Sequence, residues 1–215
     1  MKSFVITIMD NPRSVASAER CIKSTKEFGT VMSPAITPKD NPHKIFEEEG
    51  LPVENFVEKY SYLESCMSAF LSHYNLWKFS VSKKQEVQIF EHDAVAVSHL
   101  PEFISHKGCI SLGQPSYGKF NYPEGLGPVD LMSKQYFPGA HAYRVKPIAA
   151  RALIEQAKID AGPTDIFLHN DRFPFLEEYY PWPVVAKDSF TTIQKEEGCL
   201  AKHNWRGGER YEIIR

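Results

Sequence analysis

Glu91, His92 and Asp93 place two carboxylates around a histidine, directly after the apolar run "VQIF". A divalent cation bound to a diphosphate needs only one or two protein carboxylates, because phosphate oxygens and waters complete its shell. Side chains two residues apart point to the same side of an extended chain. Glu91 and Asp93 are therefore the candidate metal ligands, and His92 is expected to point away. The alternative is that the three residues are the solvated end of a buried strand.

A further carboxylate, Asp165, lies in the stretch "GPTD". A carboxylate within hydrogen-bond reach of a hydroxyl can take its proton, so Asp165 is the candidate general base. The competing interpretation is a turn and helix start in which Asp165 serves free backbone amides. His169 follows four residues later, a spacing that puts it on the same side of a helix, as a third metal ligand or a phosphate contact.

The first elements that must position these residues are a strand and a helix. Residues 3–9, "SFVITIM", predict a buried strand, and an amphipathic helix is expected from Ser14 to a stop at Gly29. Asp10, Asn11 and Arg13 occupy the turn between them, where turn chemistry also explains them. Residues 30–36 predict a second strand, which Pro34 demotes to a sheet edge, and a short helix ends at Gly50.

The longest element is a helix after Ser61, which forms a Ser-x-x-Glu capping pattern with Glu64. Its apolar residues recur every three or four positions over roughly five turns. Strands are expected at 87–90, 109–113 and 139–145, and a helix at 147–162. This alternation predicts a single-domain α/β fold, Rossmann-like, with a mainly parallel sheet and a ligand at the carboxyl ends of its strands.

Several blocks of the chain, in order, are similar to a known family. The segment "ESCMSAFLSHYNLWK" resembles the "G-E-x-G-C-x-x-S-H-x-x-x-W" block of glycosyltransferase family 25, the lipooligosaccharide and collagen-type glycosyltransferases. The strand "IFEHD" then corresponds to a family strand ending in "EDD", "GAHAY" to a "G-x-x-A-Y" strand, "PTD" to "P-x-D", and "SFTTIQ" at 189–194 to a closing "S-x-I". Ser65 stands where the family has glycine, and "MDNPRSVASAER" follows its opening only loosely.

This resemblance implies a GT-A type fold over residues 1–194. It also implies transfer of a hexosyl or pentosyl group from a nucleotide-diphosphate donor, a UDP-sugar, to a hydroxyl, with manganese or magnesium at Asp93 and Glu91 and Asp165 as base. A metal there acts as a Lewis acid on the leaving diphosphate. The residues expected to bind donor or acceptor are Asp10, Asn11, Arg13, Ser72, His73, His141, Tyr143 and His169. For His73 and Ser72, ordinary packing within the long helix is the alternative.

Two acceptors fit the remaining sequence. The aperiodic stretch 114–138 holds several aromatic residues and is expected to form a lid or substrate wall. It suits either a saccharide or a hydroxymethylated base flipped out of DNA. The tail 195–215 interleaves basic residues with Trp205 and suits phosphates and bases. A formal charge of −2 marks no general nucleic-acid binder.

Composition fits an ordinary globular protein. The chain has 215 residues, 42% hydrophobic and 24% charged, and its four widely spaced cysteines favour reduced thiols. The apolar run at the N-terminus is too short for a signal peptide or a membrane span, so a cytoplasmic location is expected. Two other classes stay open: a non-catalytic carbohydrate- or nucleotide-binding protein on a degenerate transferase fold, and a hydrolase-like enzyme using Cys66 or Asp165.

Overall fold

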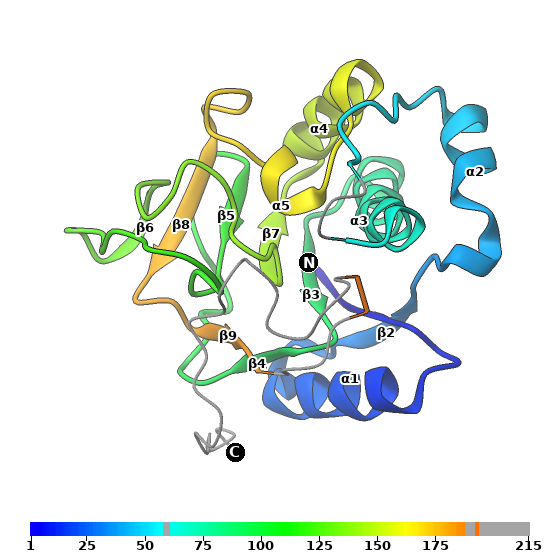
Figure 1. The fold of residues 1–215 in the computed structure, drawn as a ribbon. Coiled ribbons are helices and arrows are strands. Elements are labelled where there is room, and N and C mark those ends of the chain that lie inside the picture. The colour runs from blue at the N-terminus through cyan, green and yellow to red at the C-terminus, as the bar shows by residue number, and fades with distance from the viewer. Residues whose placement is uncertain (58–60, 188–191, 194–215) are drawn as a thin grey trace.

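The computed structural model describes residues 1–57, 61–187 and 192–193 of the chain (Figure 1). The predicted tail 195–215 and most of "SFTTIQ" lie outside these residues. The strands are β1 Lys2–Thr7, β2 Val31–Pro34, β3 Val87–Glu91, β4 Ala94–Ala96, β5 Cys109–Ser111, β6 Gly127–Asp130, β7 Ala142–Val145, β8 Leu176–Tyr180 and β9 Val184–Ala186. The α-helices are α1 Pro12–Ser24, α2 Pro42–Glu49, α3 Leu63–Lys83, α4 Pro147–Asp160 and α5 Thr164–Phe167.

Seven strands form one sheet in the order β2-β1-β3-β7-β5-β8-β6, and β4 pairs with β9 in a second, two-stranded sheet. The pairs β1–β2, β1–β3 and β5–β8 are parallel. β7 runs antiparallel to both β3 and β5, and β6 antiparallel to β8. The predicted α/β class with a Rossmann-like sheet is therefore confirmed; the sheet is mixed, and its parallel half, as a continuous run of strands, is built from β2, β1 and β3.

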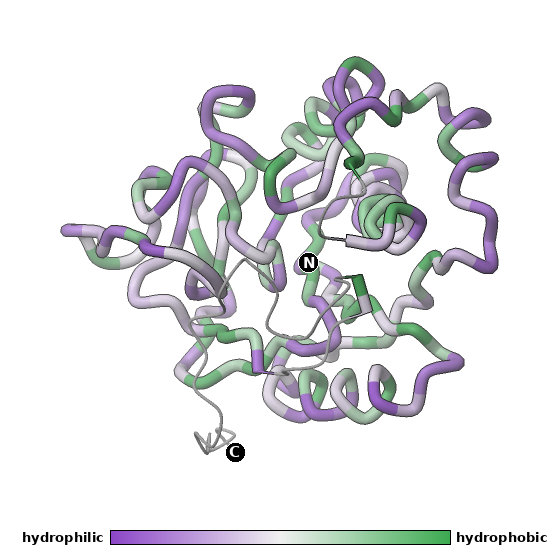
Figure 2. Tube along the Cα trace, in the orientation of Figure 1, coloured by the Kyte–Doolittle hydropathy of each residue, from purple (hydrophilic) through white to green (hydrophobic). Residues whose placement is uncertain are grey.

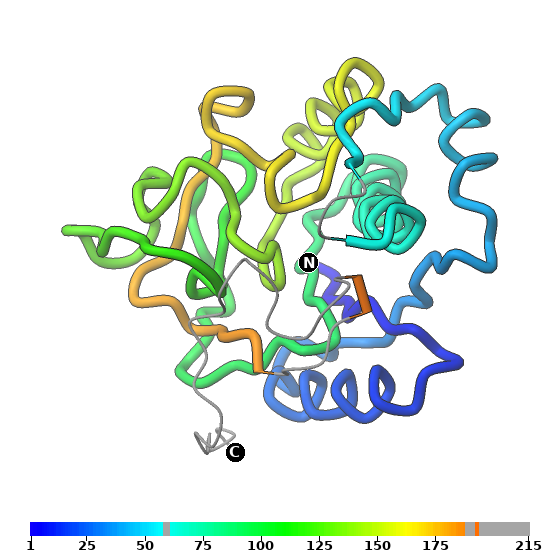
Figure 3. The backbone as a smooth tube through the Cα atoms, in the orientation of Figure 1, coloured from blue at the N-terminus to red at the C-terminus, as the bar shows by residue number. Residues whose placement is uncertain are grey.

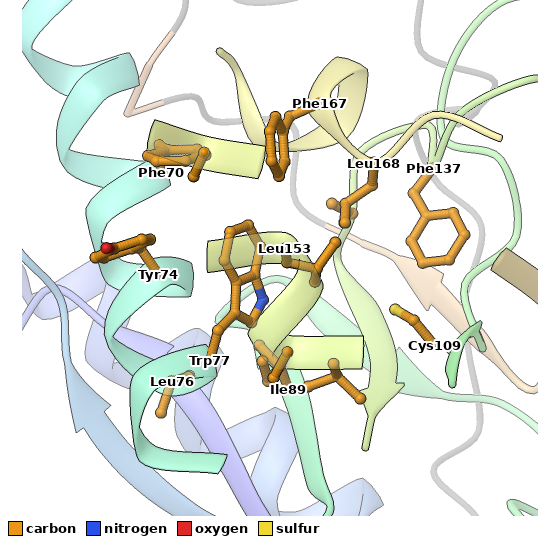
Figure 4. Packing of buried hydrophobic residues seen from close by; sticks show 14 of the residues in the cluster. Phe70, Tyr74, Leu76, Trp77, Ile89, Cys109, Phe137, Leu153, Phe167 and Leu168 are labelled. Atoms are coloured by element: carbon orange, nitrogen blue, oxygen red, sulfur yellow. The ribbon is translucent and has the colours of Figure 1, made fainter. Parts of the chain in front are cut away.

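Helices cover both faces of this sheet. α1 packs on one face, where Ala18 and Cys21 share a buried cluster with Phe90 of β3. α3 and α4 pack on the other face, where Trp77 and Leu153 bury against Ile89 (Figure 4). β3 thus buries its alternate side chains into two separate clusters, as a strand covered on both sides must. Hydrophilic and hydrophobic residues alternate along the turns of α1, as expected of a helix with one buried face (Figure 2).

The N-terminal half follows its sequence signals closely. β2 is an edge strand, and Pro34 is its last residue, where the missing N–H breaks no internal ladder. α2 ends at Gly50, whose φ of 65° lies in the left-handed region that glycine adopts without strain. Figure 3 shows β1 and β3, which pair in parallel, side by side in the middle of the molecule. The carboxyl ends of β1, β2 and β3 therefore open at one edge.

Three details differ from the sequence-based expectations. α3 begins at Leu63 with Tyr62 as its N-cap and no side-chain cap, so the predicted capping box at Ser61 is wrong. The stretch 114–138, expected to be an irregular loop, contains β6 paired with β8. β3 ends at Glu91, and His92 and Asp93 form a turn into β4, so the expected extended run through Asp93 is also wrong.

Candidate functional site

A cavity of about 470 Å³ opens at the carboxyl ends of β1, β2 and β3. Ile8 and Asp10 come from the end of β1, residues 35–39 from the end of β2, and Glu91 and His92 from the end of β3. α3 forms a further wall with Ser65, Ser68, Ala69, Ser72 and His73. The volume of the cavity lies in the range of small-molecule sites.

The rim of this cavity is set by the turns that follow β1 and β2. The Asn11 side chain accepts hydrogen bonds from the amides of Arg13 and Ser14 and caps α1. Asp10 forms an ion pair with Lys39, which joins the two turns. The pKa of Asp10 is lowered by its hydrogen bond from Lys39 and by the charge of that lysine. Asp10 and Asn11 therefore lie at the cavity as predicted, and Arg13 lies outside its lining.

Ser72 connects α3 to the second turn. Its hydroxyl oxygen accepts from the amide of Ile36 at 2.9 Å, and its proton goes to the carbonyl of Ser68, also at 2.9 Å. Hydroxyl groups mid-helix commonly bond back to the carbonyl four residues earlier. Ser72 thus shapes the cavity wall by fixing the segment after β2 against α3. On the same wall, the amide of Tyr62 donates to the carbonyl of Ile193 at 2.8 Å, which brings Thr192 and Ile193 to the cavity.

His73 and Glu91 form the polar centre of the site. The two side chains meet at 3.3 Å between Nε2 of His73 and Oε1 of Glu91. The other ring nitrogen of His73, Nδ1, lies 2.9 Å from the hydroxyl of Tyr143. The oxygen of that hydroxyl accepts a hydrogen bond from the indole N–H of Trp77, at 2.9 Å. A continuous hydrogen-bonded chain therefore runs from the core, through α3 and β7, to a carboxylate at the cavity.

Burial controls the charges of this pair. Burial lowers the pKa of His73 to about 3, so its imidazole is neutral at physiological pH. Burial also raises the pKa of Glu91 to about 7; the positive charge of His92 opposes this shift and the negative charge of Asp165 adds to it. A carboxyl group that titrates near neutrality at a cavity is typical of functional sites.

Asp165 lies close enough to this pair to affect both members electrostatically. One of its oxygens accepts from the hydroxyl of Tyr117 and the other from the amide of Ile166 at 2.9 Å. Burial raises its pKa, while the hydrogen bond from Tyr117 pulls the other way. Asp165 lies in the short helix α5 and accepts from a neighbouring amide, as the helix-start interpretation predicted, and it lies outside the cavity lining.

Asp93 and His92 take positions other than those expected. His92 lines the cavity together with Glu91, whereas Asp93 lies outside the lining. Burial raises the pKa of Cys21 to about 12 with a contribution from the charge of Asp93, and the same charge acts on His141. Asp93 therefore lies close enough to Cys21 of α1 and to His141 to affect both electrostatically. Of the two predicted metal ligands, Glu91 lines the cavity and Asp93 does not; a diphosphate-bound cation can use a single protein carboxylate.

The other predicted residues lie around the site rather than in it. Tyr143 is buried behind His73 and belongs to the hydrogen-bonded chain. The buried ring of His141 packs so tightly on Gly113 that a Cβ there would lie 2.4 Å from its Nε2. His169 stacks on Tyr136 and lies outside the cavity lining. Over the described residues, no three His, Cys, Asp or Glu side chains gather into a metal site.

The structure adds cavity residues that sequence reasoning missed. Thr37, Pro38 and Lys39 follow β2 at the same edge as Asp10. Their signal was their position, since a turn after a parallel strand belongs to the ligand edge of such a sheet. Lys39 supplies an exposed cation next to the cavity. Cys66, in contrast, is a poor candidate for a nucleophile at neutral pH, because burial raises its pKa to about 12, with the charge of Asp165 adding to the shift.

Comparisons with known proteins add no assignment. The sequence matches no protein-family model and no curated protein. Within the part of the chain that the structure describes, no helix is both long and apolar enough to cross a bilayer.

Proposed function

We propose that the chain is a glycosyltransferase that moves a sugar from a nucleotide-diphosphate donor, a UDP-sugar, to a hydroxyl acceptor, with the help of a divalent metal ion. The observation that carries this proposal is that three polar residue pairs, distant in the sequence, line one cavity. Asp10 and Asn11, Ser72 and His73, and Glu91 and His92 come from distant segments and all line it. The same segments carry the resemblance to glycosyltransferase family 25.

The cavity suits a nucleotide-diphosphate for three reasons. It opens at the carboxyl ends of parallel strands, where nucleotides bind in α/β folds. Its volume of about 470 Å³ is in the range of such ligands. Lys39 places a positive charge at its rim, where it would attract phosphate oxygens.

Glu91 is the residue proposed to hold the metal, manganese or magnesium. Its side chain is 27% exposed at the cavity, so phosphate oxygens and water can share the coordination shell. The bound cation would neutralise the charge that develops on the leaving diphosphate. Glu91 is held by His73 and needs no further movement to face the ligand. For Asp93, the metal role stays a prediction that must be tested separately from that of Glu91.

Asp165 is the proposed base for the acceptor hydroxyl. Burial raises its pKa, which makes its carboxylate a better proton acceptor. Tyr117 now donates to one of its oxygens, so an acceptor hydroxyl would replace Tyr117 as the donor. The aromatic side chains of Tyr117 and Tyr136, with ring centroids 6.2 Å apart, stand beside Asp165 and suit the face of a sugar or a base.

A screen of nucleotide sugars by thermal shift, with and without Mn²⁺, tests the donor. A ligand that binds only the folded state raises the melting temperature. A nucleoside-diphosphate sugar that stabilises the protein more with Mn²⁺ than without is the expected result. Stabilisation by no nucleotide would contradict the proposal. Stabilisation without transfer or donor hydrolysis would instead favour the non-catalytic binding protein, which the position of Asp93 outside the cavity also favours.

Asp165→Asn tests the base, with Asp160→Asn as its control. The amide introduced by Asp165→Asn keeps an oxygen for Tyr117 but cannot take up a proton, so kcat is expected to fall by about 10²–10⁴. Asp160 pairs with Arg172 at 2.9 Å at the end of α4, and its replacement should leave transfer unchanged. Equal activity of the two variants would contradict the role of Asp165.

The acceptor is proposed to be a saccharide or a hydroxymethylated base in DNA. Binding to duplex DNA that weakens steeply as salt rises would favour DNA, because phosphate contacts release counterions. Transfer to a free saccharide that is insensitive to salt would favour a carbohydrate acceptor.

A further inference from the structure

Trp77 and Tyr143 take part in the polar chemistry of the site although they are buried in the core. Both side chains are fully buried, and so is His73, whereas Glu91 at the end of the chain is partly exposed. Buried polar groups are costly unless hydrogen-bonded. The bonds from Trp77 to Tyr143, and from Tyr143 to His73, satisfy each group in turn. The apolar core thus contains a directed path that ends at the cavity.

The donors and acceptors along this path fix the positions of its protons. The indole of Trp77 can only donate, so the oxygen of Tyr143 accepts from it. Tyr143 has a single proton, and the acceptor within its reach is Nδ1 of His73 at 2.9 Å. When Tyr143 donates this proton to Nδ1, the neutral imidazole carries its own proton on Nε2. That proton points to Oε1 of Glu91.

The anchor of this path is rigid. The Trp77 ring lies near-parallel to that of Phe167, at 5.7 Å and 24°, and meets the ring of Phe70 edge-on at 5.7 Å. Figure 4 shows the indole held between these rings and the side chain of Leu153. Close packing leaves a large ring of this kind one orientation. This packing directs its N–H at the hydroxyl of Tyr143.

We infer that Trp77 and Tyr143 are positioning residues, which hold His73 as the Nε2-protonated tautomer so that its proton orients the carboxylate of Glu91 at the cavity. This arrangement follows the general pattern in which the second nitrogen of a functional histidine is fixed by a hydrogen bond. The tautomer is a property of the protein without ligand, whereas its effect on transfer rests on the proposed function.

The tautomer can be measured directly from the ¹⁵N chemical shifts of His73 at pH 7. The expected result is a protonated Nε2 and an unprotonated Nδ1 in the ligand-free protein. In Tyr143→Phe the donor to Nδ1 is lost while Nε2 still faces Glu91, so the Nδ1 signal is expected to move toward that of an acceptor nitrogen without a hydrogen bond. Tyr74→Phe is the matched control: Tyr74 lies on α3 with His73, but its hydroxyl donates to Glu49, so the Nδ1 signal should not move. A protonated Nδ1 in the wild type, or an unchanged Nδ1 signal in Tyr143→Phe, would overturn the inference.

Kinetics separate positioning from a general loss of stability. For an active transferase, Tyr143→Phe and Trp77→Phe should lower kcat by about 10-fold with little change in KM, as outer partners of functional ligands do. Trp182→Phe controls for the loss of an indole N–H, since Trp182 donates to Glu178 at 2.8 Å, outside the chain from Trp77 to Glu91. A loss shared equally by Trp182→Phe and Tyr74→Phe would contradict positioning. If no donor is ever transferred, the proposed function fails while the tautomer result still decides the inference.

Discussion

A histidine–glutamate pair flanks β3 at each end, and the two pairs have different electrostatic surroundings. Glu86, which precedes the first residue of β3, pairs with His106. Glu91, the last residue of β3, pairs with His73. Both histidines are buried, and both glutamate side chains are 27% exposed. The two pairs thus share residue types and side-chain exposure, and they differ in how deeply each carboxyl group is buried and in its charged neighbours.

The pKa values of the two glutamates shift in opposite directions. Burial opposes ionisation of Glu86, but the hydrogen bond from His106 and the charges of Arg144 and Lys146 outweigh it and lower its pKa. Burial raises the pKa of Glu91 to about 7, and the nearby negative charge of Asp165 adds to the effect. A carboxylate among cations is a stable structural ion pair. A carboxyl group at a cavity whose pKa is raised by burial and by a second carboxylate is typical of functional sites, and this is where we propose that a cation binds.

The two histidines differ in the hydrogen bonding of their second ring nitrogen, Nδ1. Nδ1 of His73 is hydrogen-bonded to Tyr143, whereas Nδ1 of His106 has no hydrogen-bond partner among the described residues. The pair at the cavity is thus oriented from behind by a second hydrogen bond, and the pair at the amino end of β3 is not. Position along a parallel strand, rather than residue type, therefore separates the proposed functional pair from the structural one.

Matched Glu→Gln changes at the two pairs should give the largest difference in a transfer assay. Glu91→Gln removes the proposed metal ligand, and loss of several kcal/mol of charge stabilisation corresponds to about 10³-fold in kcat. Glu86→Gln should transfer at the rate of the wild type. Equal losses in the two variants would show that the carboxyl end of β3 holds no special role.

The pH dependence of the free energy of unfolding should differ between the wild type and Glu91→Gln, an effect smaller than the loss of transfer but measurable. Glu91 has a folded pKa of about 7, raised from 4.5, so its contribution is fully present below pH 4.5 and lost as pH rises through 7. Relative to Glu91→Gln, the wild type should therefore lose free energy of unfolding between pH 4.5 and about pH 8. Urea unfolding of both proteins across this range measures the difference. Parallel curves would contradict the raised pKa.

Much of the parallel half of the fold was predictable because its signals are local. The runs of β-branched residues predicted β1 and β3, Pro34 predicted the edge strand, and Gly50 predicted the end of α2. β8 was not predicted from the sequence, because "LEEYY" contains two adjacent glutamates, which are not expected in a buried strand. Glu178 is nevertheless buried, since it accepts from the amides of Met132 and Ser133, which only the folded chain brings to it.

The site was predictable as a set of segments but not as a geometry. Asp10, Ser72, His73 and Glu91 were all expected near a ligand, and they line one cavity. The sequence spacing of Glu91 and Asp93 suggested a shared side, yet the turn after β3 separates them. The bond between Trp77 and Tyr143 joins residues 66 positions apart, so the periodicity of α3 indicated only a core tryptophan.

A smaller effect is expected at the amino end of β3, where Glu86→Gln exchanges a charged acceptor for a neutral one. The hydrogen bond from His106 should weaken, and the free energy of unfolding should fall by about 1–2 kcal/mol at pH 8. Under the same conditions Glu91→Gln should not destabilise the protein, because it removes a buried charge. Urea unfolding at pH 8 checks both variants, and destabilisation of Glu91→Gln alone would contradict the assignment.

The smallest effect is expected at Cys66, which lies next to the cavity-lining Ser65 and for which we propose no part in the chemistry. Its raised pKa of about 12 predicts very slow alkylation by iodoacetamide in the folded protein at pH 8 and fast alkylation in urea. Cys66→Ala should leave transfer essentially unchanged. Rapid alkylation of the folded protein that abolishes activity would revive the cysteine-dependent alternative.

The proposed position of a nucleotide-bound metal, at the carboxyl ends of β1–β3, can be read from Mn²⁺ broadening of backbone amide signals. With UDP and Mn²⁺ present, we expect selective loss of the amide signals of Asn11, Ser72 and Glu91, while those of Glu86 and His106 persist. No broadening, or broadening centred on Glu86, would contradict the proposed site.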